Sequence, residues 1–173
     1  SLSKSHWEEN LMYKVMVIDD HPIVRKGLSG IIDSNENLEV IASASDGIEA
    51  LAILEKLQDD VPDIILVDVL MPRMNGIEFI KTVKTVSKII ILSTEIDRYA
   101  VVNLLSLGIS GYLLKDEAPN DIVKNIEKVL NSDDYVALST EIIDEINKNK
   151  SKNQLNLLDR QIELLGMVAN GLT

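Results

Sequence analysis

Three aspartates directly follow short apolar runs, and they are the residues of this sequence best suited to chemistry. Asp19 and Asp20 follow one such run and Asp68 follows another. Three converging carboxylates repel one another, so protonation or a bound cation must relieve the charge. Mg²⁺ commonly takes one or two carboxylates together with waters and a phosphate oxygen. The pattern therefore predicts a Mg²⁺ site, with the backbone carbonyl of Leu70 as a candidate further ligand.

Asp68 is also the candidate nucleophile. A carboxylate that attacks phosphorus forms an aspartyl phosphate, and a metal ion neutralises charge on the transferred group. Two more polar residues end apolar runs: the Ser93 hydroxyl can donate to a phosphoryl oxygen, and Lys115 offers phosphate a point charge. Each residue alone is commonly a surface or capping residue. The five polar groups together, at the ends of four runs, indicate a phosphate site.

Short apolar runs alternate with segments of helical period along most of the chain. The runs lie at residues 15–18, 38–42, 64–67, 89–92 and 112–114. This alternation is typical of a parallel sheet covered by helices on both faces. We predict an α/β fold, a flavodoxin-like (βα)5 doubly wound parallel sheet with strand order 2-1-3-4-5. In that order the runs before Asp19 and Asp68 are neighbours, and their carboxyl ends border the crevice where ligands bind.

Composition and charge restrict the class of protein. Of 173 residues, 46% are hydrophobic, 26% charged and 3% aromatic, which favours a soluble globular protein with an aliphatic core. The absence of cysteine excludes a disulfide framework and suits a cytoplasmic location. No signal peptide or membrane span is expected, because no apolar run approaches the roughly 20 residues that a span needs. The net charge of −11 opposes DNA binding without a basic cluster.

Four segments resemble the receiver domain of bacterial response regulators. They read VMVIDDH at residues 15–21, IILVDVLMPRMNGIE at 64–78, IIILST at 89–94 and GYLLKD at 111–116. The resemblance implies that Asp68 accepts a phosphoryl group from a sensor histidine kinase, while Asp19 and Asp20 hold Mg²⁺. It also implies that the group is later lost by autodephosphorylation, so that the protein is a signalling switch and not a turnover enzyme.

The same resemblance assigns a switch. Ser93 would be the switch hydroxyl, Tyr112 the switch aromatic and Lys115 the phosphate-pairing lysine. A phosphate on Asp68 would attract the Ser93 hydroxyl and vacate space into which the Tyr112 ring can turn. We expect this change to promote a homodimer. Asp116, after the lysine, is similar to the NarL/FixJ branch of the family.

The end of the chain resembles the opening of the LuxR-type helix-turn-helix domain of that branch. The segment LLDRQIELLGMVANGLT fills residues 157–173, although Leu158 and Asp159 depart from the usual Thr/Ser-Pro start. Four regions are expected: an N-terminal extension at 1–13, the receiver at 14–133, a linker with a short helix at 134–156, and an incomplete helix-turn-helix domain at 157–173. DNA binding is expected only through the missing remainder of that last domain.

Two local predictions concern helices. Residues 140–147 are predicted to form the short helix, with Ser139 as its N-terminal cap. The segment 101–107 carries an apolar face wider than one core contact requires, formed by Val101, Val102, Leu104, Leu105 and Leu107. That face fits either a deeply packed helix or a partner surface.

We weighed three other functions against a response regulator that controls transcription. A stand-alone receiver acting only through protein contacts has the same motifs. A haloacid-dehalogenase-type phosphatase requires a second acidic residue two positions after the nucleophile. Leu70 occupies that position, which argues against this class. A flavodoxin-like FMN protein would cradle phosphate with Gly, Ser and Thr, whereas Asp19 and Asp20 would repel phosphate without a metal. His21 could be read as a metal ligand or phosphodonor, but entry into the first helix beside Pro22 is favoured.

Overall fold

The computed structural model describes residues 11–148. Expectations that fall on residues 1–10 and 149–173, including the opening of the helix-turn-helix domain, lie outside the described residues. Within residues 11–148 the strands are β1 Tyr13–Ile18, β2 Leu38–Ala44, β3 Ile64–Asp68, β4 Lys88–Ser93, β5 Gly111–Leu114 and β6 Ala137–Leu138. The helices of this range are α1 Pro22–Asp33, α2 Gly47–Leu57, α3 Gly76–Thr82, α4 Arg98–Ser106, α5 Pro119–Asn131 and α6 Thr140–Lys148.

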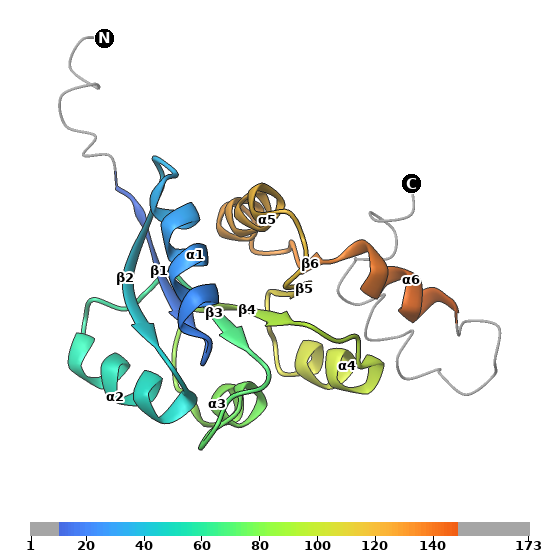
Figure 1. Ribbon diagram of the computed structural model, residues 1–173, viewed down its shortest axis with the longest axis horizontal. Coiled ribbons are helices and arrows are strands. Elements are labelled where there is room, and N and C mark those ends of the chain that lie inside the picture. The colour runs from blue at the N-terminus through green and yellow to red at the C-terminus, as the bar shows by residue number, and fades with distance from the viewer. Residues whose placement is uncertain (1–10, 149–173) are drawn as a thin grey trace, which may run out of the picture.

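The described strands form one parallel sheet in the order β2-β1-β3-β4-β5-β6 (Figure 1). The predicted doubly wound, flavodoxin-like fold and its order 2-1-3-4-5 are confirmed. Ile18 at the end of β1 pairs with Val67 of β3, so Asp19 and Asp68 follow paired residues on neighbouring strands. This register brings the acidic residues of both strands to one edge of the sheet.

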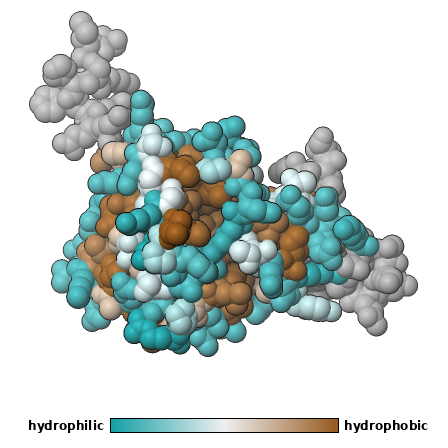
Figure 2. All heavy atoms as spheres, in the orientation of Figure 1, coloured by the Kyte–Doolittle hydropathy of each residue, from teal (hydrophilic) through white to brown (hydrophobic). Residues whose placement is uncertain are grey.

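Helices cover both faces of the sheet because successive strand residues point to opposite sides. Val15 and Val17 pack with α1 and α5, while Met16 and Ile18 pack with α2, α3, α4 and α6. Both clusters are almost entirely aliphatic, as the low aromatic content predicts. On the surface, hydrophobic residues lie in separate patches among hydrophilic ones (Figure 2). Among the described residues, no helix has the length and apolarity needed to cross a membrane.

The sheet continues beyond the predicted fifth strand. Ala137 and Leu138 pair with Gly111 and Tyr112, which adds the short strand β6 inside the region expected to be a linker. The predicted short helix follows as α6. Ser139 immediately precedes α6, but the hydrogen bond that its hydroxyl accepts comes from the backbone of β5 and not from the helix.

The broad apolar face of α4 is mostly core. Val101, Leu104 and Leu105 are buried, in one cluster with Ile142 and Ile146 of α6. Figure 1 shows α6 lying next to α4. The deeply packed alternative is therefore confirmed for these three α4 residues, because they are buried in the core of the same chain.

Candidate functional site

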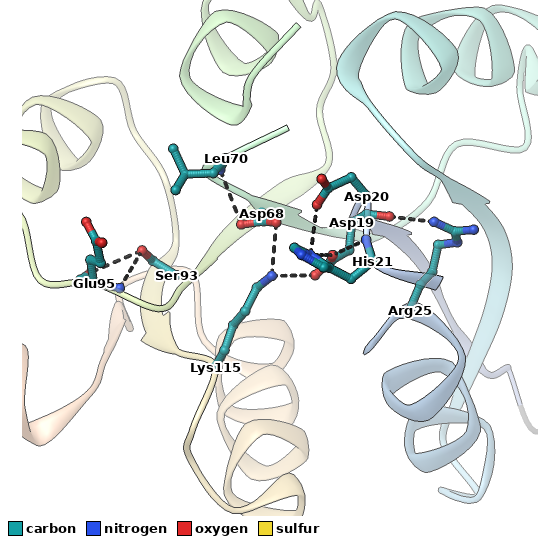
Figure 3. A network of polar contacts seen from close by, with 9 residues as sticks. All are labelled: Asp19, Asp20, His21, Arg25, Asp68, Leu70, Ser93, Glu95 and Lys115. Carbon is teal, nitrogen blue, oxygen red and sulfur yellow. Dashed lines mark hydrogen bonds and ion pairs between the residues drawn. The ribbon is translucent and has the colours of Figure 1, made fainter. Parts of the chain in front are cut away.

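The carboxyl ends of β1 and β3 bring the three predicted aspartates together. One oxygen each from Asp19, Asp20 and Asp68, with a ring nitrogen of His21, lie within 4.8 Å of one another. Asp19 and Asp68 are buried, whereas Asp20 is partly exposed. Figure 3 shows these side chains converging from the ends of the two strands. The sheet order explains the convergence, because β1 and β3 are neighbours although about fifty residues separate their ends.

Lys115 follows β5 and reaches two of these carboxylates. Its Nζ lies 2.7 Å from Asp19 Oδ2 and 2.9 Å from Asp68 Oδ2 (Figure 3). Burial alone would lower the pKa of Lys115, but the two carboxylates outweigh it and raise that pKa above its usual value. The ammonium therefore stays charged and offsets part of the repulsion between the two buried aspartates.

The carboxyl group of Asp68 has a raised pKa. Its burial is the largest cause, and the repulsion of Asp19 adds to it, while the ammonium of Lys115 acts in the opposite direction. The backbone N–H of Leu70 donates to Asp68 Oδ1 across 3.2 Å. This donor and Lys115 engage different oxygens of Asp68, so both help to orient the carboxylate.

His21 is closer to the acidic cluster than sequence reasoning favoured. Its backbone N–H donates to Asp19 Oδ1 across 2.8 Å, and its Nδ1 lies 2.9 Å from Asp20 Oδ1. His21 also directly precedes Pro22 at the start of α1, which agrees with the predicted entry into the first helix. Its position directly after the two aspartates was the signal for a role in the cluster.

Arg25 was missed altogether. Its Nη1 donates to the backbone carbonyl of Asp19 across 2.6 Å. Arg25 stands four residues after His21, one turn along α1, and this spacing was the available signal. The contact holds the backbone of Asp19, and it leaves the carboxylate free for other partners.

The acidic cluster has the properties of a site for a hard cation. Asp19 Oδ2 and Asp20 Oδ1 are buried and accept no hydrogen bond from the described residues. Lys115 and His21 lie beside them at ion-pair distance without hydrogen-bond geometry. Buried carboxylate oxygens normally have a partner, and clustered oxygens suit Mg²⁺. The residues present therefore fit a divalent cation.

Of the two predicted switch residues, Ser93 ends β4 and Tyr112 lies within β5. The Ser93 hydroxyl donates to the backbone carbonyl of Glu95 across 3.0 Å and accepts from the backbone N–H of Glu95 across 3.1 Å. Tyr112 is only 1% exposed, and burial raises the pKa of its hydroxyl. The backbone of Tyr112 pairs with Leu138 of the added strand β6.

Comparisons with known proteins agree with this geometry. A family model described as the response regulator receiver domain matches residues 15–127. The chain is 32% identical over 169 residues to the transcriptional regulatory protein YdfI of Bacillus subtilis (strain 168), across 93% of this chain and 77% of that protein. It is 30% identical over 166 residues to the nitrate/nitrite response regulator protein NarL of Escherichia coli (strain K12), across 91% of this chain and 76% of that protein. A solved LuxR-family two-component response regulator from Aurantimonas sp. SI85-9A1 matches with a TM-score of 0.72 at 29% identity, across 80% of this chain and 98% of that chain.

Proposed function

Because this chain belongs to the response regulator receiver domain family, we propose that a sensor histidine kinase phosphorylates Asp68 in a Mg²⁺-dependent reaction. The match and the relatives make the chain part of a two-component system. The phosphorylated receiver would then change state and control a DNA-binding transcriptional output. YdfI, a relative, is named as a transcriptional regulatory protein, which supports an output of this class.

The proposed reaction transfers a phosphoryl group to a carboxylate oxygen of Asp68. A new P–O bond forms, and the bond from phosphorus to the donor's imidazole nitrogen breaks. The nitrogen keeps the electron pair of that bond, so no oxidant or reductant is needed. The Lys115 ammonium is held by Asp19 and Asp68 and can remain beside the transferred group as a counter-charge. Hydrolysis of the aspartyl phosphate would later restore the carboxylate.

The residues that would hold Mg²⁺ are Asp19, Asp20, Asp68 and the backbone carbonyl of Leu70. When bound, the ion supplies positive charge that lessens repulsion between an incoming phosphoryl group and the three carboxylates. Asp68 is oriented by the N–H of Leu70 even without that charge. The convergence of carboxylate oxygens from Asp19, Asp20 and Asp68 within 4.8 Å of one another supports this assignment.

Ser93 and Tyr112 are the proposed switch. The Ser93 hydroxyl would exchange its Glu95 partners for a phosphoryl oxygen on Asp68, which alters the surroundings of the Tyr112 hydroxyl. We propose that this change favours a homodimer. DNA would be bound by a helix-turn-helix domain that opens with residues 157–173.

One observation carries the proposal: Lys115 bridges a buried Asp19 and a buried Asp68 within 2.9 Å of each. The test is intact-mass analysis of the chain after acetyl phosphate, with Mg²⁺ or with excess EDTA. We expect one added phosphoryl group with Mg²⁺ and none with EDTA. Asp68→Asn should remain unlabelled while keeping its circular dichroism spectrum. Undiminished labelling of that variant, or efficient labelling in EDTA, would refute the assignment.

A further inference from the structure

The loop between Asp68 and α3 contains a residue with unusual backbone geometry. Arg73 has a φ of 62°, in the left-handed region that side chains disfavour. Glycine is the residue that adopts this conformation most readily. An arginine at this position indicates that its side chain makes an interaction which offsets the unfavourable backbone.

The interaction is with Asp46, the N-terminal cap residue of α2. Arg73 Nε donates to Asp46 Oδ2 across 2.6 Å, and Arg73 Nη2 lies 2.5 Å from the same oxygen. Asp46 is only 3% exposed, so this is a largely buried carboxylate. Its other oxygen accepts the N–H of Glu49 and caps the helix. Asp46 thus joins the start of α2 to the loop that follows Asp68.

Two more contacts hold the same segments together. The N–H of Gly47 donates to the Met74 carbonyl across 3.1 Å. A Cβ on Gly47 would lie 2.6 Å from Met74 Cγ, so the loop packs directly on the start of α2. The other end of the loop is equally close to the site, since a Cβ on Gly76 would lie 2.3 Å from the backbone oxygen of Asp68.

The turn that contains Asp46 also contacts the other half of the acidic cluster. Ala44, two residues earlier, accepts the backbone N–H of Asp19 across 3.0 Å. Residues 44–47 therefore connect the backbone of Asp19 with the loop that contains Leu70. A displacement of this loop would therefore change the position of the Asp68 carboxylate relative to that of Asp19.

We propose that Arg73 is a positioning residue: by binding Asp46, it holds the Asp68–Leu70 segment in register with Asp19 for cation binding and phosphoryl transfer. This inference rests on the proposed function, because it concerns the same site. Arg73 itself touches none of the three cluster aspartates in the contacts of the described residues. Its effect is exerted through the loop backbone.

Arg73→Gly is the decisive variant. Glycine accepts the left-handed backbone, so the substitution removes the ion pair without adding strain. We expect it to weaken Mg²⁺ binding to the unphosphorylated chain by about tenfold, as losses of supporting contacts around metal sites commonly do. Isothermal titration with Mg²⁺ alone measures this, and the rate of labelling by acetyl phosphate at saturating Mg²⁺ should also fall. Arg73→Lys should recover part of the Mg²⁺ affinity and part of the labelling rate, because lysine keeps the positive charge but lacks the planar guanidinium group.

Asp46→Asn tests whether the partner acts through the same contact. Asparagine can still cap α2, so the main loss is the charge that holds Arg73. The double variant with Arg73→Gly should bind Mg²⁺ no more weakly than either single variant, since both remove one interaction. Additive losses would overturn the proposal.

Lys88→Met is the matched control. Lys88 also pairs with a carboxylate, Asp133, but it begins β4 at the opposite edge of the sheet. It should bind Mg²⁺ as tightly as the wild-type chain. Equal weakening in the control, or wild-type Mg²⁺ affinity in Arg73→Gly, would overturn the inference. An unlabelled wild-type chain whose Mg²⁺ binding depends on Arg73 would instead refute the proposed function alone.

Discussion

The hydroxyl of Ser139 accepts a 2.8 Å hydrogen bond from the backbone N–H of Leu114. Both residues are buried, and Leu114 immediately precedes Lys115. The contact joins the segment between β6 and α6 to the end of β5. Residues 137–148 therefore pack as part of the sheet and its helical layer, although their sequence suggested the start of a linker.

Replacing Ser139 by alanine should destabilise the chain. The buried N–H of Leu114 would lose its acceptor, which costs about 1–3 kcal/mol. Urea unfolding followed by circular dichroism measures the loss. Ser106→Ala is the control, because Ser106 is exposed and bonds only within its own helix turn, and surface changes usually stay within about 0.5 kcal/mol. Equal stability of the two variants would contradict the structural role of Ser139.

A second prediction concerns α6. Ile142 is fully buried in the cluster that includes α4, so Ile142→Ala should reduce the free energy of unfolding by about 2–5 kcal/mol. The exposed Asp144 on the same helix provides the comparison, and Asp144→Ala should change little. If both substitutions were neutral in urea titrations, α6 would behave as a solvated linker helix and its packing on α4 would be disproved.

Asp68→Asn should stabilise the chain when no divalent cation is present. Burial raises the pKa of Asp68 even though Lys115 opposes the shift, so the folded state binds this proton more tightly than the unfolded state. That stabilising contribution is complete below the ordinary aspartate pKa and is lost as pH rises through the folded pKa. Above the folded-state pKa, the ionised Asp68 carboxylate destabilises the fold. A neutral asparagine at this position removes that destabilisation.

Thermal melts at neutral pH in EDTA check this prediction, with Asp68→Asn expected at the higher Tm. In Mg²⁺ the advantage should shrink, because the cation would stabilise the wild-type carboxylate and not the amide. The difference in Tm between Asp68→Asn and the wild-type chain should also decrease as pH falls toward the ordinary aspartate pKa, because the wild-type carboxyl group then becomes neutral. A lower Tm for the variant in EDTA would show that the Lys115 ion pair outweighs burial.

Self-association should depend on the phosphoryl group. Val101, Leu104 and Leu105 are buried in a core cluster that also contains Ile142 and Ile146 of α6, so much of the apolar face of α4 is not available to a partner. We expect a monomer at micromolar concentration, and a larger sedimentation coefficient with acetyl phosphate and Mg²⁺. Asp68→Asn should sediment as the untreated protein does. The same mass in both states of the wild-type chain would count against a phosphorylation-dependent dimer.

The sequence alone predicted the sheet, its strand order and the meeting of the aspartates. Apolar runs and helical periods are local patterns, and parallel connections leave all carboxyl ends at one edge. Once β1 and β3 are neighbours, Asp19 and Asp68 must approach each other. Lys115 and Ser93 lie at the same edge of the sheet for the same reason, because they stand at the carboxyl ends of β5 and β4.

Other relationships depend on how distant segments pack, and only the tertiary structure decided them. Arg73 and Asp46 are 27 residues apart, and neither stands in a periodic pattern that pairs them. The two residues of β6 are too few to show a period, although they place a strand beside Tyr112. The hydroxyl of Ser139 could cap a helix or join a sheet, and the nearness of Leu114 selected the second role because a buried N–H needs an acceptor.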